Sequence, residues 1–170
     1  MLIYDPALDP YHSAVRILSI ATSATKNQIK LSIDAVRIAD YFLVYPYQMI
    51  NFRFPKEFRS MRVAVKETEN PYRHAAGSHS AFERMRPIFF ASLSGLVAAD
   101  LIDGTELKHG VIKLNTTEIP TDLAEAVNRF QVRQSPVGKF VLSDLINMPT
   151  NGDEGLKHRS GLIEHKYDIT

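Results

Sequence analysis

The chain has 170 residues, of which 45% are hydrophobic and 23% are charged, and its formal net charge is +1. This composition fits a globular protein with a core of its own, and no run approaches the roughly 18 apolar residues of a membrane span. The nearly neutral charge excludes a strongly basic, histone-like binder of nucleic acid, so any such contact must come from a local cluster. The absence of cysteine excludes disulfides and thiolate metal sites.

The first predicted element is a helix near the N-terminus. Asp9 is a capping residue, and Pro10 after it fits the first turn, where a missing N–H costs nothing. We therefore predict a helix over residues 10–21, followed by a Ser-, Thr- and Lys-rich loop over residues 22–30. Residues 1–6 lack the basic start and apolar stretch of a secretory signal, so we expect a cytoplasmic protein with no membrane contact.

A second helix is predicted over residues 33–45, with Ser32 as its cap. Its polar positions lie along one edge and the remaining side chains are mostly apolar, so we expect this helix to be central and largely buried. Pro46 ends or kinks it, because proline disfavours helical geometry in the residue before it.

A third helix is predicted from Pro55 to about Glu67, with an apolar face and a basic face. The segments around residues 69–72 and 75–78 are rich in turn-forming residues and predict an exposed linker. Residues 51–86 contain eight Lys or Arg and four Glu, a net charge of +4, whereas the whole chain carries +1. Positive charge is therefore concentrated in this part of the sequence.

The longest apolar pattern starts at Ser80, and we expect one helix there with a kink at Pro87. Two short strand-like runs, at residues 101–102 and 110–114, follow it and flank a Gly-containing polar turn. A long helix that leads into such a hairpin is typical of a winged-helix module. Further helical patterns follow from about residue 121 to 134 and from Pro136 to about Met148.

These elements predict a mainly α fold with a small β-hairpin, in the α+β class. We expect a winged-helix-like domain over residues 1–115, a helical extension packed on it over residues 116–148, and a partly ordered tail over residues 149–170.

The sequence contains no catalytic or cofactor motif that we can identify. No two histidines have the i, i+4 spacing of a zinc-binding helix, and the glycine-rich motifs of nucleotide-binding loops are missing. One weak match to a metal-dependent nuclease combines Glu106 and Lys108 with Asp100 or Asp103, but these residues fall within one short hairpin. We therefore predict no enzyme activity, no metal and no cofactor.

The strongest candidate for a binding site is the basic face of the third predicted helix. Its clustered cations suit contacts with phosphates or with an acidic protein, although a solvated helix face is the plainer alternative. The basic face consists of Arg53, Lys56, Arg59, Arg62 and Lys66. Arg73, Arg84 and Arg86 continue it further along the chain.

Several segments together resemble the middle component of bacterial ABC-type three-component systems, the group that includes the Lamassu antiphage and plasmid-elimination systems. The segments are YDP at 4–6, DPYH at 9–12, IDAVRIAD at 33–40, NPY at 70–72 and FERMRPI at 82–88. The likeness covers about residues 3–114. It implies a protein encoded beside an SMC- or Rad50-like ABC ATPase and an effector, often a nuclease.

Two functions are consistent with these observations. The first is a non-catalytic adaptor subunit that binds the ATPase and the effector, linking DNA sensing by the ATPase to control of the effector. The second is a free-standing winged-helix transcriptional regulator that binds DNA itself. Salt-dependent binding to specific and random DNA distinguishes the two, because an operator-binding protein prefers its own site by about a thousandfold or more.

Overall fold

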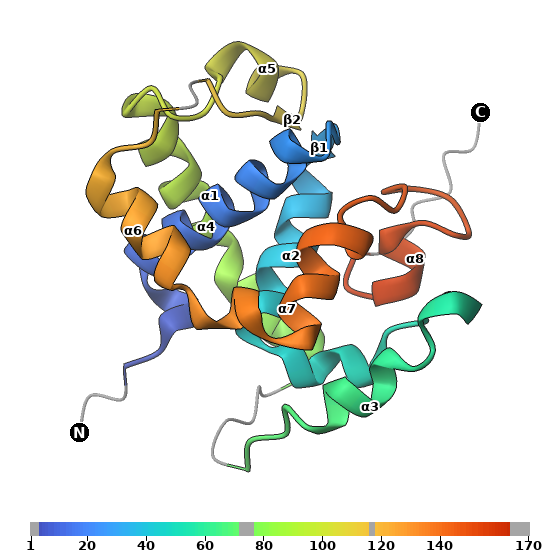
Figure 1. Cartoon of the computed structure of the whole chain (residues 1–170). Coiled ribbons are helices and arrows are strands. Elements are labelled where there is room, and N and C mark those ends of the chain that lie inside the picture. The colour runs from blue at the N-terminus through green and yellow to red at the C-terminus, as the bar shows by residue number, and fades with distance from the viewer. Residues whose placement is uncertain (1–3, 72–76, 116–117, 164–170) are drawn as a thin grey trace.

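The computed structural model describes residues 4–71, 77–115 and 118–163, and these residues are mostly helical with one small sheet (Figure 1). The α-helices are α1 (Pro10–Lys26), α2 (Ile33–Val44), α3 (Met61–Lys66), α4 (Ser78–Ala98), α5 (Gly104–Lys108), α6 (Thr121–Arg129), α7 (Pro136–Phe140) and α8 (Leu156–Ser160). The shorter elements are strands β1 (Leu31–Ser32) and β2 (Val111–Ile112), 3₁₀ turns η1 (Pro6–Leu8), η2 (Pro46–Asn51), η3 (Lys56–Phe58) and η4 (Gln131–Gln134), and a π-helical turn, η5 (Val141–Leu145).

The first helix begins where the sequence predicts. One carboxylate oxygen of Asp9 accepts hydrogen bonds from the backbone N–H groups of Tyr11 (2.8 Å) and His12 (3.1 Å). These bonds satisfy two of the donors that a helix leaves free at its start. The helix continues to Lys26, past the predicted end, because Ser23 and Ala24 are buried and extend its packed side.

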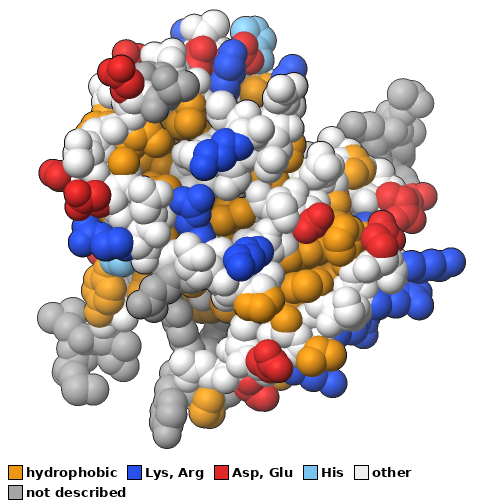
Figure 2. All heavy atoms as spheres, viewed as in Figure 1, with side chains coloured by type: hydrophobic (Ala, Val, Ile, Leu, Met, Phe, Trp, Pro, Cys, Tyr) orange, Lys and Arg blue, Asp and Glu red, His pale blue; other side chains and the backbone are white. Residues whose placement is uncertain are grey.

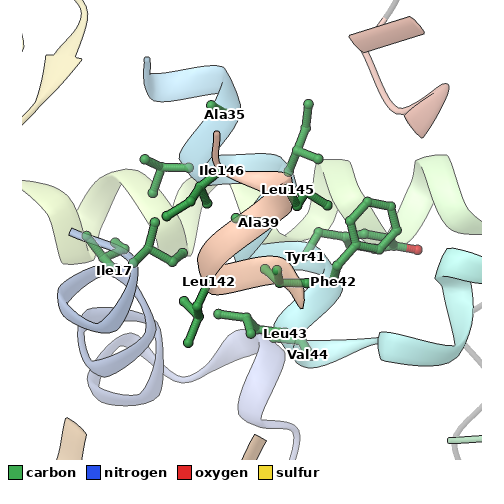
Figure 3. Packing of buried hydrophobic residues seen from close by; sticks show 14 of the residues in the cluster. Ile17, Ala35, Ala39, Tyr41, Phe42, Leu43, Val44, Leu142, Leu145 and Ile146 are labelled. Carbon is green, nitrogen blue, oxygen red and sulfur yellow. The ribbon is translucent and has the colours of Figure 1, made fainter. Parts of the chain in front are cut away.

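Helix α2 is central and largely buried, as predicted, and the Ser32 hydroxyl caps it by accepting from the N–H of Ala35 at 3.1 Å. It contacts α1, α4, α8 and η5, which surround it (Figure 1). Figure 3 shows its side chains meeting Ile17 of α1 and Leu142 and Leu145 of η5. Full burial of a Val, Leu, Ile or Phe side chain stabilises the folded state by about 1.5–3 kcal/mol. Because α2 buries several of them, it contributes strongly to the stability of the fold.

The sheet differs from the predicted local hairpin. Strand β2 pairs in antiparallel fashion with β1, far away in sequence, with Leu31 opposite Ile112. The two runs after α4 are joined by an isolated antiparallel bridge between Ile102 and Leu114, and they do not form a second regular pair of strands in the described residues. The predicted polar turn between them contains α5, because the side chain of Asp103 caps a helical turn by accepting from the N–H groups of Thr105 and Glu106.

Helix α4 runs through Pro87 as one helix, as predicted, although it starts at Ser78 and not at Ser80. Gly77 precedes it with φ +65°, a left-handed conformation that glycine adopts without strain. Pro87 is exposed, so water can reach the backbone carbonyl that its missing N–H leaves without a donor.

The hydrophobic core includes residues from all three predicted parts of the chain, 1–115, 116–148 and 149–170. One cluster of buried side chains includes Val15, Val127, Phe140 and Leu156, so the predicted domain and its extension share a single core. Residues 149–163 were predicted to belong to a partly ordered tail, but they contain α8. Leu156 of this helix is fully buried against the other elements. Residues 164–170 lie outside the described part of the chain.

Candidate functional site

The basic face does not lie on one regular helix. Residues 56–58 form η3 and α3 begins only at Met61, so the predicted continuous helix from Pro55 to Glu67 is replaced by two short pieces. The ring of Phe58 packs against that of Phe140 with centroids 5.2 Å apart, and this tertiary contact places η3 against α7. Ser60, at the N-cap position of α3, makes no side-chain capping bond to the helix.

Arg53 is tied to α8. Its guanidinium lies 2.8 Å from the Nε2 of His158, and its backbone N–H donates to the carbonyl of Arg159 at 2.9 Å. In return, the guanidinium of Arg159 donates to the carbonyl of Arg53 at 2.7 Å. The structure therefore separates Arg53 from the rest of the basic face and gives it a part in holding the segment before η3 against α8.

The remaining four cations are exposed on η3, α3 and the turn between them. Lys56, Arg59, Arg62 and Lys66 make no ion pair with any residue that the structure describes. Val63, on the same helix as Arg62, is 66% exposed. Lys and Arg side chains gather at the lower right of Figure 2, where η3 and the start of α3 lie in Figure 1. We call these four cations with Val63 the η3–α3 surface.

The described arginines that were predicted to continue the basic face, Arg84 and Arg86, lie near acidic side chains. Arg84 lies 4.0 Å from the carboxylate of Asp5, and Arg86 lies 3.9 Å from that of Glu83. Both arginines have acidic neighbours on the folded protein, so they offer less free positive charge than the η3–α3 surface. Arg73 lies outside the described residues.

A groove of about 640 Å³ lies beside η3, between residues 54–58 and residues 144–159. Its charged lining is mixed: Lys56 and Arg159 are basic, and Glu57, Asp144 and Glu154 are acidic. Arg159 is paired with Glu154. Mixed charges do not suit a phosphate, which favours a cluster of cations alone, so the η3–α3 surface remains the stronger candidate.

Two acidic residues of the weak nuclease match, Asp100 and Asp103, have structural partners. Asp103 caps α5, and the side-chain oxygen of Asp100 accepts a hydrogen bond from the side-chain amide of Asn115 at 2.5 Å. Within the described ranges, no three His, Asp or Glu side chains come together as metal ligands. The structure therefore accounts for the carboxylates of Asp100 and Asp103 by their local hydrogen bonds.

The sequence reasoning missed a buried ion pair between α1 and α2. The Nε of Arg16 donates to a carboxylate oxygen of Asp40 at 2.5 Å, and both side chains are only 2% exposed. Burial raises the pKa of Asp40, and the neighbouring Arg16 guanidinium opposes that rise. The signal in the sequence was Arg16, a charged residue inside an apolar run of α1. Because α2 carries three charged residues, Asp34, Arg37 and Asp40, the sequence alone does not tell which of them pairs with Arg16.

A comparison with protein families matches residues 2–168 to ABC-three component (ABC-3C) system Middle Component 5. The chain belongs to this family. This match confirms the predicted resemblance to the middle component of ABC-type three-component systems, and it extends past the predicted limit of the likeness at residue 114.

The other comparisons add no relative: no curated protein and no solved structure matches the chain. None of the helices in the described ranges is both long and apolar enough to cross a membrane. The ABC-3C middle component is thus one part of a system with several components, and the surfaces through which it meets the others are the main functional question.

Proposed function

We propose that this ABC-3C middle component is a non-catalytic adaptor that binds an SMC- or Rad50-like ATPase and an effector subunit, and couples DNA sensing by the ATPase to control of the effector. The family match carries the proposal, because it makes the chain one component of a three-component system. Such a subunit acts by presenting surfaces to its neighbours. Interfaces of roughly 800 Å² on each partner are sufficient for a stable complex.

The proposed core is winged-helix-like. The order of the elements supports it: the long helix α4 is followed by two antiparallel segments that meet at Ile102 and Leu114. β2 also pairs with β1, which directly precedes α2. In the order of elements, η3 and α3 form an insertion between α2 and α4.

The η3–α3 surface is the proposed contact with an acidic partner subunit. Its four cations have no described acidic partner of their own, and opposite charge on another subunit steers association. Val63 favours protein over DNA as the partner, because an exposed apolar side chain gains from burial against protein and finds no match in a phosphate backbone.

The second candidate is a free-standing DNA-binding regulator, and Lys56, Arg59 and Arg62 favour it, because none of them forms an ion pair with a described residue. Phosphates recognise such clusters, and each neutralised phosphate steepens the dependence of affinity on salt. The nearly neutral charge of the whole chain argues for the adaptor, because DNA-binding domains usually carry excess positive charge.

Co-expression with the subunits encoded beside this gene tests the adaptor. We expect a complex that co-purifies at moderate salt, and we expect Lys56→Glu, Arg59→Glu and Arg62→Glu together to disrupt it. The control is Lys26→Glu, Lys108→Glu and Lys113→Glu, which changes net charge equally at exposed lysines outside the η3–α3 surface. If the co-expressed wild-type chain purifies without the neighbouring subunits, this result would contradict the adaptor function. Loss of DNA binding from an intact complex would assign the surface to nucleic acid.

A further inference from the structure

A second groove, of about 360 Å³, lies between the start of α1, the end of α2 and α6 with η4. Most of the side chains that line it are apolar, including Val44, Ala126, Phe130 and Val132. α6 contacts α1 and supplies one wall, so the groove depends on the helical extension. Its volume is in the range of sites that accept a small ligand or one or two side chains.

Three nitrogen-bearing side chains also line this groove: His12, Arg16 and Arg129. The Nη2 atom of Arg16 is buried and has no hydrogen-bond acceptor among the described residues, although Nε and Nη1 bind Asp40 and the carbonyl of Pro6. A buried donor without an acceptor is costly, and it indicates a missing oxygen from water or a ligand. Arg129 is 75% exposed, and its only described ion pair is to Glu125 on the same helix, at 3.5 Å.

Exposed apolar side chains continue the groove at the N-terminal end of α1. Tyr4 is 60% exposed, Leu8 39% and Tyr11 54%, and Tyr11 also lines the groove. The rings of Tyr4 and Tyr11 lie 5.7 Å and 6.0 Å from the His12 ring, so the patch and the groove adjoin. Apolar residues that cluster on a surface in this way mark sites of protein contact.

We propose that this α1–α6 groove binds a segment of a partner subunit that carries an apolar side chain and a nearby carboxylate. The apolar side chain fills the space beside Val44 and Phe130, and the carboxylate lies against the exposed guanidinium of Arg129. The charge of Arg16 is already balanced by Asp40, so Arg16 offers this segment only the Nη2 donor that has no described acceptor. A protein segment fits better than a small molecule, because the exposed tyrosines extend the apolar surface beyond the groove itself. This inference rests on the proposed function, since the segment belongs to another subunit of the same system.

Photo-crosslinking in the co-expressed complex tests the groove directly. p-Benzoylphenylalanine replaces Tyr11 in one preparation and Val63 in another, and mass spectrometry identifies the linked peptides. We expect the Tyr11 position to link to a partner peptide that contains an apolar residue and an Asp, a Glu or a C-terminal carboxylate. Links from Tyr11 to nucleic acid alone, or to a peptide without a carboxylate, would overturn the proposal.

Substitutions provide the matched controls. Ala126→Phe fills the groove and is expected to weaken binding of that partner at least tenfold, whereas Asn128→Phe, at an exposed position of the same helix, leaves it unchanged. Arg129→Glu is a second variant at an exposed site, where a change of fold is not expected, and Lys26→Glu is its control. We expect Arg129→Glu to weaken the complex and Lys26→Glu to preserve it.

The outcomes separate this inference from the proposed function. If the wild-type complex forms but gives no link at Tyr11, and Ala126→Phe and Arg129→Glu bind normally, the groove proposal is wrong and the adaptor stands. If the wild-type chain forms no complex with the neighbouring subunits, the adaptor and the groove proposal fail together.

Discussion

The hydroxyl of Ser32 lies 2.8 Å from the hydroxyl of Thr150, although 118 residues separate them in the chain. The same two regions meet again where Lys157 pairs with Asp34 at 2.9 Å. The C-terminal segment is therefore fastened to the start of α2, the central helix. Its contribution to the fold can be measured.

We expect Leu156→Ala to lower the free energy of unfolding by about 2–5 kcal/mol, because this fully buried side chain joins α8 to the core. Asp153→Ala, at an exposed position in the preceding turn, is the control and should change it by less than about 0.5 kcal/mol. Urea denaturation measures both. Equal, small effects would show that the segment behaves as a tail.

The buried pair between Arg16 and Asp40 predicts a non-additive result. Asp40→Ala alone should cost about 3–5 kcal/mol, because it leaves a buried guanidinium without its counter-charge. Arg16→Met combined with Asp40→Leu should recover most of that loss, since an apolar pair needs no desolvation of charge. Denaturation of both variants tests this, and a double variant no more stable than the single one would contradict it.

The cap of α1 predicts a dependence of stability on pH. Hydrogen bonds from the His12 N–H, the Tyr4 hydroxyl and the Tyr11 N–H lower the pKa of Asp9 below its ordinary value of 3.8. The folded protein thus holds the Asp9 proton less tightly than the unfolded chain does. The stabilisation is complete above that ordinary value and is lost as the pH falls through the folded pKa.

Asp9→Ala should therefore cost about 1 kcal/mol at pH 7 and progressively less as the pH falls below 3.8. Asp9→Asn keeps a capping oxygen and should retain most of the stability at pH 7. Thermal unfolding across a series of buffers measures the difference between each variant and the wild type. A difference that stays constant with pH would exclude Asp9 as the titrating group.

Two glycines in helices predict opposite effects of the same substitution. A Cβ atom on Gly138 of α7 would lie 1.6 Å from the carbonyl oxygen of Val132, so Gly138→Ala should destabilise the protein by about 3 kcal/mol. A Cβ on Gly95 of α4 meets nothing within 4 Å, so Gly95→Ala should stabilise by about 0.5–1 kcal/mol. Melting temperatures that shift in the same direction would contradict this packing.

Val63 predicts an effect on binding that is separate from folding. Because its side chain is mostly exposed, Val63→Ser should change the free energy of unfolding by less than about 0.5 kcal/mol. We expect it to weaken the complex with the acidic partner several-fold, while Val63→Ile preserves the affinity. Surface plasmon resonance with the purified partner subunit measures both, and identical affinities for the three proteins would remove Val63 from the interface.

Local signals in the sequence were sufficient for the elements that depend on neighbouring residues. The caps at Asp9 and Ser32 and the burial of α2 follow from hydrogen bonds and apolar spacing within a few residues. The mainly α class, the helix through Pro87 and the family resemblance were also predicted from such patterns. The cationic composition of the η3–α3 surface was visible in the same way.

The tertiary structure decided which distant residues meet. β2 pairs with β1 and not with its neighbour in sequence, Phe140 holds η3 against the core, and Arg16 finds Asp40 on another helix. The α1–α6 groove likewise exists only because α6 packs beside α1. Periodicity reports which face of an element is apolar, but the choice of partner for that face depends on the packing of the whole core, which no local pattern contains.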